Sequence, residues 1–311
     1  MNKPFIVALT LIIAGTFVGV LLSGRDMPEQ SQGDQIRVAA TIFPIYDIVQ
    51  RVAGDAAQVI LIVPPGASPH TFAVTPKLIA ELEDVDTVFS VGGIDEWVTE
   101  LVDLTEVTEA HVDERVVRYD MTGGEAASHD DAGDDHDHDH DGSDPHYWLS
   151  VPNAIVIAET VADVMSKIDP GEAITYRENF EKLSSELINL DSDIRKELFD
   201  LPARNVVVMH DAWQYYAREY DLTVLASFQP SPGQEPLPRD IEELQKTVRD
   251  NQITTLFREP QISEESIQAI AKDLKIQVGV LDPLGGVPGR ASYDEMMRYN
   301  TKTIADSLRS R

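Results

Sequence analysis

The residues of this chain best suited to chemistry are histidines that lie where predicted strands or helices end. His70 follows a turn rich in proline and glycine, His146 comes just before a predicted helix, and His210 ends an apolar run. Asp282 also follows an apolar run of β type. Because parallel α/β proteins place ligand groups at the carboxyl ends of their strands, these four residues are candidates for one shared site.

Three imidazoles and one carboxylate can form a tetrahedral shell, which suits Zn²⁺. Imidazole ligands also suit Cu²⁺ and Ni²⁺, whereas Mn²⁺ prefers more oxygen. The chain has no cysteine, so any metal site must use His, Asp and Glu. The alternative is that each histidine caps a helix or packs locally, because sequence alone does not show that four separate residues converge.

A second group of histidines lies in an acidic segment of low complexity, residues 123–144, with four His, eight Asp and four Gly. Its histidines are His129, His136, His138 and His140. Without apolar periodicity this segment is expected to be a mobile loop. It would bind metal loosely as an accessory site, or it is a solvated linker without a role. The remaining histidine, His111, is expected to be a surface or packing residue.

The charge balance favours cations over anionic partners. Lys and Arg number 25 against 54 Asp and Glu, which gives a net charge of −29. Such a surface repels nucleic acid. At the N-terminus, Lys3 precedes an apolar run over residues 4–22, and a polar segment follows. Residues 1–34 are therefore expected to be a signal peptide or an N-terminal membrane anchor, and the protein to be extracytoplasmic, in the periplasm or tethered by residues 4–22 to the outer face of the cytoplasmic membrane.

After this segment, β-type runs alternate with helical patterns, which predicts an α/β fold with parallel sheets. The first series of predicted strands covers residues 36–42, 58–63, 87–91 and 115–119, and the second covers 206–209, 222–226, 254–257 and 278–281. Between the two series, residues 171–200 carry an apolar stripe at helical spacing, and a helix of about 28 residues would be roughly 42 Å long. We therefore expect an N-terminal lobe (35–170), a linking helix (171–200) and a C-terminal lobe (201–311).

Several segments resemble the cluster A-I solute-binding proteins of zinc and manganese ABC transporters, and in particular the zinc-uptake type. The matching segments carry the family's four ligand motifs, in order: Pro65-Gly66-Ala67-Ser68-Pro69-His70, Asp144-Pro145-His146-Tyr147-Trp148-Leu149, His210-Asp211-Ala212-Trp213 and Leu281-Asp282-Pro283-Leu284-Gly285. Two later segments, Gly233-Gln234-Glu235-Pro236 and Phe257-Arg258-Glu259-Pro260-Gln261, are similar to further stretches of the family. The resemblance covers about residues 36–311.

The resemblance implies two Rossmann-like lobes, one long rigid linking helix and a metal site in the inter-lobe cleft. It implies metal-ligand roles for His70, His146, His210 and Asp282. Histidine at the third position is usual in zinc-type members, so Zn²⁺ is the first choice and Mn²⁺ the second. Some zinc-type members have an acidic residue before the first histidine, where this chain has Pro69. That difference leaves Asp282 as the better fourth ligand, with water as the alternative.

The implied function is capture of Zn²⁺ outside the cytoplasm and delivery to the membrane permease of an ABC importer, by a monomer that catalyses no reaction. A metalloenzyme is disfavoured, because the chain has no His-Glu-x-x-His motif, no Gly-x-Ser-x-Gly motif and no phosphate-binding loop. A surface adhesin, or a periplasmic zinc buffer without a transporter, would share the site but not the permease contact.

Overall fold

Two four-stranded parallel sheets form the framework of this protein. The computed structural model describes residues 35–119, 143–229 and 238–310. The strand order is β2-β1-β3-β4 in the first sheet and β6-β5-β7-β8 in the second, so both sheets have the same topology. The described residues from Ile36 onward belong to one compact unit. The predicted α/β fold with two parallel-sheet lobes is confirmed.

The elements alternate along the chain as expected for βα units. The first lobe contains β1 (Ile36–Ala40), α1 (Phe43–Ala53), β2 (Ala57–Leu61), η1 (Pro69–Thr71), α2 (Pro76–Glu81), β3 (Thr87–Ser90), α3 (Trp97–Leu104), β4 (Thr108–His111), η2 (Tyr147–Leu149) and α4 (Val151–Ile168). After α5 (Ala173–Glu197), the second lobe contains β5 (Asn205–His210), α6 (Gln214–Glu219), β6 (Thr223–Gln229), α7 (Pro238–Asp250), β7 (Thr255–Arg258), α8 (Glu264–Leu274), β8 (Gln277–Val280) and α9 (Tyr293–Arg309).

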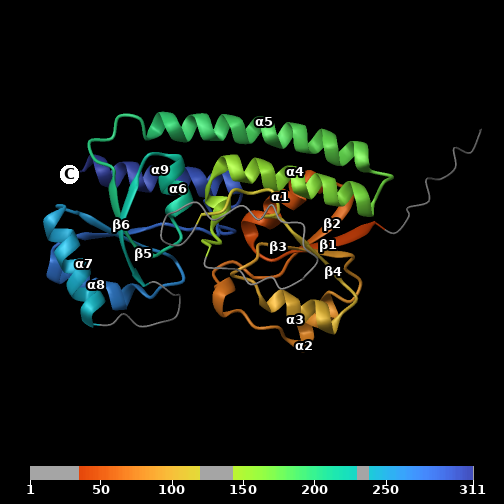
Figure 1. Cartoon of the computed structure of the whole chain (residues 1–311), viewed down its shortest axis with the longest axis horizontal. Coiled ribbons are helices and arrows are strands. Elements are labelled where there is room, and N and C mark those ends of the chain that lie inside the picture. Colours follow the sequence, from red (N-terminus) through yellow and green to blue (C-terminus); the bar gives the residue numbers. More distant parts are fainter. Residues whose placement is uncertain (1–34, 120–142, 230–237, 311) are drawn as a thin grey trace, which may run out of the picture. The chain divides into compact units, whose positions relative to one another are not determined.

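Each sheet is covered by helices on both faces. In the first lobe α2 and α3 pack on one face, with Leu78 and Val98 buried against Val88 of β3. In the second lobe α7 and α8 take the equivalent place, with Leu244 and Ile267 buried. The opposite faces of both sheets share one continuous core with α1, α4, α5 and α9 (Figure 1). The two lobes therefore fold around a common apolar centre.

The long helix α5 spans this common core. It runs along the upper side of the molecule in Figure 1 and packs against α4 and α1 of the first lobe and α9 of the second. Its 25 residues give a length of about 38 Å. The predicted stripe faces inward, because Tyr176, Leu183, Leu187, Leu190 and Ile194 are all buried. The helix predicted to join the lobes is therefore present.

Hydrogen bonds donated by two buried aromatic side chains also join the lobes. Trp148 Nε1 donates to the carbonyl of Pro283 at 2.8 Å, and the Tyr293 hydroxyl donates to the carbonyl of Trp148 at 2.7 Å. Both rings are almost fully buried. Because a buried polar group left without a partner is costly, these bonds fix the position of η2 against the second lobe.

Arg51 connects three helices where the two lobes meet. Arg51 of α1 lies 2.6 Å from Asp294 of α9 and pairs with Glu186 of α5 and with Asp47 of its own helix. Its side chain is only 24% exposed. We expect Arg51→Ala to lower the free energy of unfolding by about 2 kcal/mol, because it leaves partly buried carboxylates facing one another.

Urea unfolding of the two proteins measures that loss. Lys302→Ala is the matched control, because its i,i+4 pair with Asp306 is exposed and screened by solvent. Equal stability of Arg51→Ala and Lys302→Ala would show that the junction does not depend on this cluster.

One predicted strand is wrong. Residues 115–119 form a turn and an isolated bridge, and the fourth strand of the first sheet is β4, Thr108–His111. β4 lies at the edge of the sheet, so its residues are only partly buried and carry a polar pattern that hides the strand. Val116 is buried, but in the turn that follows β4.

Candidate metal site

His210 lies at the end of β5, the strand of the second sheet that has β6 on one side and β7 on the other. The apolar residues Val206–Met209 form the centre of β5, and His210 is its last residue, 5% exposed. β7 pairs with β5, and Glu259 follows β7 directly. The ring Nδ1 of His210 lies 3.0 Å from Oε1 and 3.2 Å from Oε2 of Glu259. Glu259 therefore accepts the Nδ1 proton and leaves Nε2 free to bind a cation.

His146 is held in a similar way by Asp144. The Asp144 Oδ1 atom accepts hydrogen bonds from the backbone N–H of His146 at 2.9 Å and from its ring Nδ1 at 2.8 Å. Both residues are buried. Asp144 is the last residue of the segment predicted to be a mobile loop, yet its backbone N–H donates to the carbonyl of Tyr119. It is thus part of the site and not of a solvated linker.

His70 comes from the short helix η1, which follows the turn after β2. Pro69 begins this helix and is buried, and Trp97 Nε1 donates to its carbonyl at 3.1 Å. The half-buried His70 ring faces the other two histidines. The position of η1 therefore depends on α3, the helix that begins with Trp97.

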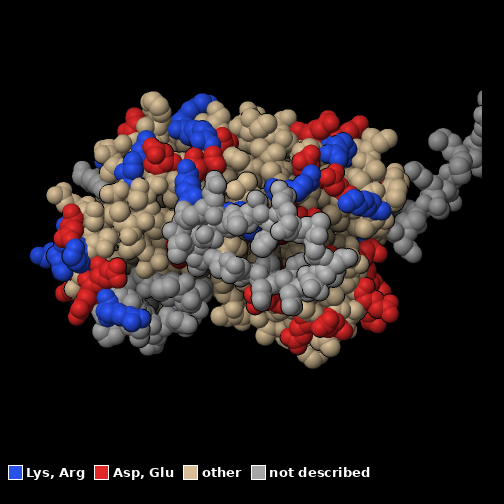
Figure 2. All heavy atoms as spheres, in the orientation of Figure 1, with Lys and Arg blue, Asp and Glu red and all other residues tan. Residues whose placement is uncertain are grey.

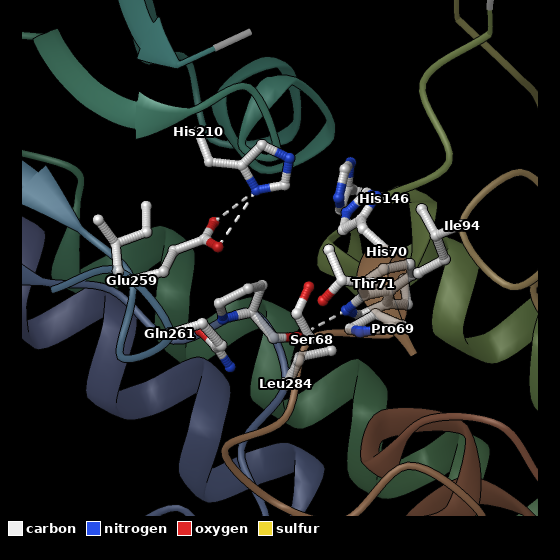
Figure 3. Close-up of a pocket in the computed structure, with 13 residues that line it drawn as sticks. Ser68, Pro69, His70, Thr71, Ile94, His146, His210, Glu259, Gln261 and Leu284 are labelled. Atoms are coloured by element: carbon white, nitrogen blue, oxygen red, sulfur yellow. Dashed lines mark hydrogen bonds and ion pairs between the residues drawn. The ribbon is translucent and has the colours of Figure 1, made fainter. Parts of the chain in front are cut away.

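The three rings converge on one point. Ring nitrogens of His70, His146 and His210 all lie within 4.8 Å of one another, and among residues 35–119, 143–229 and 238–310 no other His, Asp or Glu joins them. They line a cavity of about 150 Å³ together with residues of both lobes. In Figure 3 the ring nitrogen of His210 that points away from Glu259 faces His146 and His70. This arrangement can bind one cation through three imidazoles.

The surroundings change the proton affinity of two of these rings in opposite directions. Burial, together with the neighbouring His146 and His210, lowers the pKa of His70 to about 3. Burial also lowers the pKa of His210, but the charge and hydrogen bond of Glu259 outweigh it, so that its pKa is raised above the usual value. His70 is thus neutral at physiological pH, whereas a proton competes with a cation for His210.

Asp282 lies outside this group, although its position after β8 is as predicted. It is 2% exposed, and its Oδ1 accepts the backbone N–H groups of Leu284 and Gly285, both at 3.0 Å. Its Oδ2 lies 3.3 Å from Nε of Arg290. The structure therefore brings together three of the four predicted ligands, and holds the carboxylate of the fourth within its own loop.

The other histidines are separate from the cavity or are not described. His129, His136, His138 and His140 lie outside the described residues, as do residues 1–34 and the segment 233–236. His111 is the last residue of β4, and its Nδ1 lies 3.2 Å from the hydroxyl of Ser90. Within the described part of the chain, no helix is long and apolar enough to cross a membrane.

Sequence reasoning missed the roles of Glu259 and Asp144. A signal for Glu259 was present, because it follows a predicted strand in the same way as His210 follows its own. Acidic side chains gather at the lower right of the face shown in Figure 2, in the region where Figure 1 places α3. In and beside α3, the exposed acidic residues are Glu96, Glu100, Asp103 and Glu106. The negative charge of the chain is therefore visible on the surface of the first lobe.

Comparison with known proteins agrees with this geometry. Residues 38–307 match the family model described as zinc-uptake complex component A, periplasmic. The zinc-binding lipoprotein AdcA of Streptococcus pneumoniae is 29% identical over 88% of this chain, which spans 56% of that relative. The iron-binding protein YfeA of Yersinia pestis is 26% identical over 98% of this chain and 97% of its own length.

The fold is also shared with a solved structure. The crystal structure of ZnuA has a TM-score of 0.76 and 25% identity, and the match covers 88% of this chain and all of that one. The resemblance predicted from the motifs is confirmed, and the family's periplasmic description agrees with the expected extracytoplasmic location. Since the family model matches most of the chain, this protein belongs to the family of periplasmic zinc-uptake complex A components.

Proposed function

We propose that this protein captures Zn²⁺ outside the cytoplasm and delivers it, as a monomer, to the membrane permease of an ABC importer. The observation that carries the proposal is the convergence of His70, His146 and His210 from both lobes on one cavity. Two of the rings are oriented by carboxylates, so their free nitrogens are aimed before the ion arrives. Such orientation raises the affinity of a site for its metal.

Zinc is the first choice because imidazole nitrogen is its usual ligand, and Mn²⁺ is the second. The names of the relatives mention different metals, zinc for AdcA and iron for YfeA. The choice of metal proposed for this chain therefore rests on the chemistry of its own ligands. In the arrangement observed, water would take the fourth position, and Asp282 could do so only by leaving Arg290.

Capture fits the site better than catalysis. A catalytic zinc needs a nearby group free to accept a proton from bound water. The carboxylates beside the rings, Asp144 and Glu259, each accept the Nδ1 proton of a histidine and so serve to orient a ligand. We therefore propose a binding protein and not a hydrolase.

A competition titration with Zn²⁺ and Mn²⁺ tests this function. One tight zinc site per chain, weaker for Mn²⁺, is expected. The absence of a tight zinc site would refute the proposal. Co-purification with the permease of an ABC importer encoded beside this protein in the genome would support the importer role. Its failure would favour an adhesin or a zinc buffer.

The acidic histidine segment is proposed as an accessory collector of zinc. Deleting residues 123–142 removes His129, His136, His138 and His140 but keeps Asp144, which orients His146. We expect the shortened protein to keep its tight zinc site and to lose only weak additional binding, measured by the same titration. Loss of the tight site in this variant would mean that the segment, and not the cavity, holds the ion.

A further inference from the structure

The strand β8 forms an open edge of the second sheet. Within the described part of the chain it pairs with β7 alone. The N–H of Leu281 donates to the carbonyl of Arg258 at 2.9 Å, so the residues of β8 that face β7 are those in phase with Leu281. Because the backbone groups of successive strand residues point to opposite sides, Val278 and Val280 direct their N–H and carbonyl groups away from β7. These groups are available to a further strand.

A groove of about 530 Å³ lies beside this edge, between β8 and the helix α8. Its apolar lining comes from both elements and from the link between them: Ala271, Ile276, Val278 and Val280. The two valines are only half-buried, because α8 does not cover the edge of the sheet completely. None of the residues of this groove lines the metal cavity. The groove is therefore a separate surface, with an apolar lining beside unpaired backbone groups.

The groove is lined by positive charge in a strongly acidic chain. Arg258 and Lys272 both line it, whereas no Asp or Glu of the described residues does. Over the whole chain, 54 Asp and Glu stand against 25 Lys and Arg, so a groove lined by cations alone differs from the general charge of this protein. Lys272 is exposed, and among the described residues no carboxylate pairs with it. A carboxylate entering the groove would therefore meet complementary charge.

We propose that the groove between β8 and α8 binds an extended acidic segment of a partner protein, which joins the second sheet as a fifth strand. The open edge calls for an extended segment, because only a strand can pair with the outward backbone groups of Val278 and Val280. The charge calls for an acidic one, because carboxylates on the side of the added strand that faces α8 lie next to Lys272. In such strand addition, backbone hydrogen bonds supply affinity and alternate side chains supply specificity.

The test adds a short acidic peptide, acetyl-Glu-Val-Glu-Val-Glu-Val-amide, to the full chain. In an extended peptide of this pattern all carboxylates lie on one side. We expect the backbone amide NMR signals of Val278 and Val280 to shift as the peptide binds. The basic counterpart, acetyl-Lys-Val-Lys-Val-Lys-Val-amide, should bind at least about tenfold more weakly, because it brings like charge to Lys272.

Val280→Pro tests the strand pairing. Proline is tolerated where the N–H of an edge strand points away from its neighbour, so this variant keeps the pairing of β8 with β7 and loses one outward donor. We expect it to bind the acidic peptide about tenfold more weakly.

Val59→Pro is the matched control, because Val59 lies in β2, an edge strand of the first sheet. Its N–H also points outward, since the N–H of Ile62 donates to the carbonyl of Ala40 on the neighbouring strand. This control should bind the peptide as the original chain does.

Lys272→Glu tests the charge and should reverse the preference, so that the basic peptide binds more tightly than the acidic one. If Val280→Pro does not fold, this reversal decides. Equal binding of the two peptides by the original chain would overturn the proposal, as would binding that leaves the signals of β8 unchanged or an equal loss in Val59→Pro. Signals of β8 that shift with protein concentration, without peptide, would make a second copy of the chain the occupant and would also overturn it.

Discussion

His210→Ala is expected to weaken zinc binding by at least about a hundredfold. Tight four-ligand zinc sites bind with about 10–16 kcal/mol, so each ligand supplies about 3 kcal/mol, which corresponds to more than a factor of 100 in affinity. The substitution also leaves Glu259 buried without the ring N–H that it now accepts. Loss of the ligand is the larger effect, and competition with a zinc chelator of known affinity measures the net change.

His111→Ala is the matched control for this experiment. It removes the same side chain from the end of another strand, β4, where the ring contacts Ser90 and does not line the cavity. We expect its zinc affinity to equal that of the original chain. Retention of tight binding by His210→Ala would contradict the cavity site, and the ion would then have to be held elsewhere.

The histidines of the site could be predicted because each lies next to the end of a strand or helix. β-type runs before His210 and Asp282 indicated strands, and parallel strands end at a common edge. The convergence of the three rings could not be predicted in this way, because it depends on how η1 and η2 of the first lobe meet the second lobe. Trp148, which donates to Pro283 across the junction, shows that packing far apart in sequence sets this geometry.

The surroundings of Asp282 and the position of β4 could not be predicted from the sequence pattern. The residues around Asp282 fit a ligand motif, but the partner that holds its carboxylate, Arg290, comes from a turn whose shape is not visible in a hydrophobic pattern. For β4, partial burial at the sheet edge weakened the apolar signal. The valines within residues 115–119 gave a stronger signal, so the strand was predicted there instead. In both cases the deciding contacts leave no trace in the hydrophobic pattern of the sequence.

Zinc affinity is expected to fall with decreasing pH, starting above the usual histidine pKa of about 6.5. A proton on His210 competes with zinc, whereas His70 stays neutral down to about pH 3. Glu259 raises the pKa of His210, so this ring becomes protonated at a higher pH than an ordinary histidine. Below that pKa each bound ion displaces one proton from His210, and the apparent affinity should drop by about tenfold per pH unit.

Glu259→Gln separates this proton competition from a general effect of acid. The amide oxygen can still accept the Nδ1 proton of His210, but the negative charge that favours the imidazolium is gone. The pKa of His210 should therefore fall, and the loss of zinc affinity should begin at a lower pH than in the original chain. At high pH the variant should bind zinc about tenfold more weakly, because a neutral partner makes the ring a poorer ligand. Titrations between about pH 5 and pH 8 measure both effects. An onset that does not move would mean that protons compete at another group, and that Glu259 orients His210 without setting its charge.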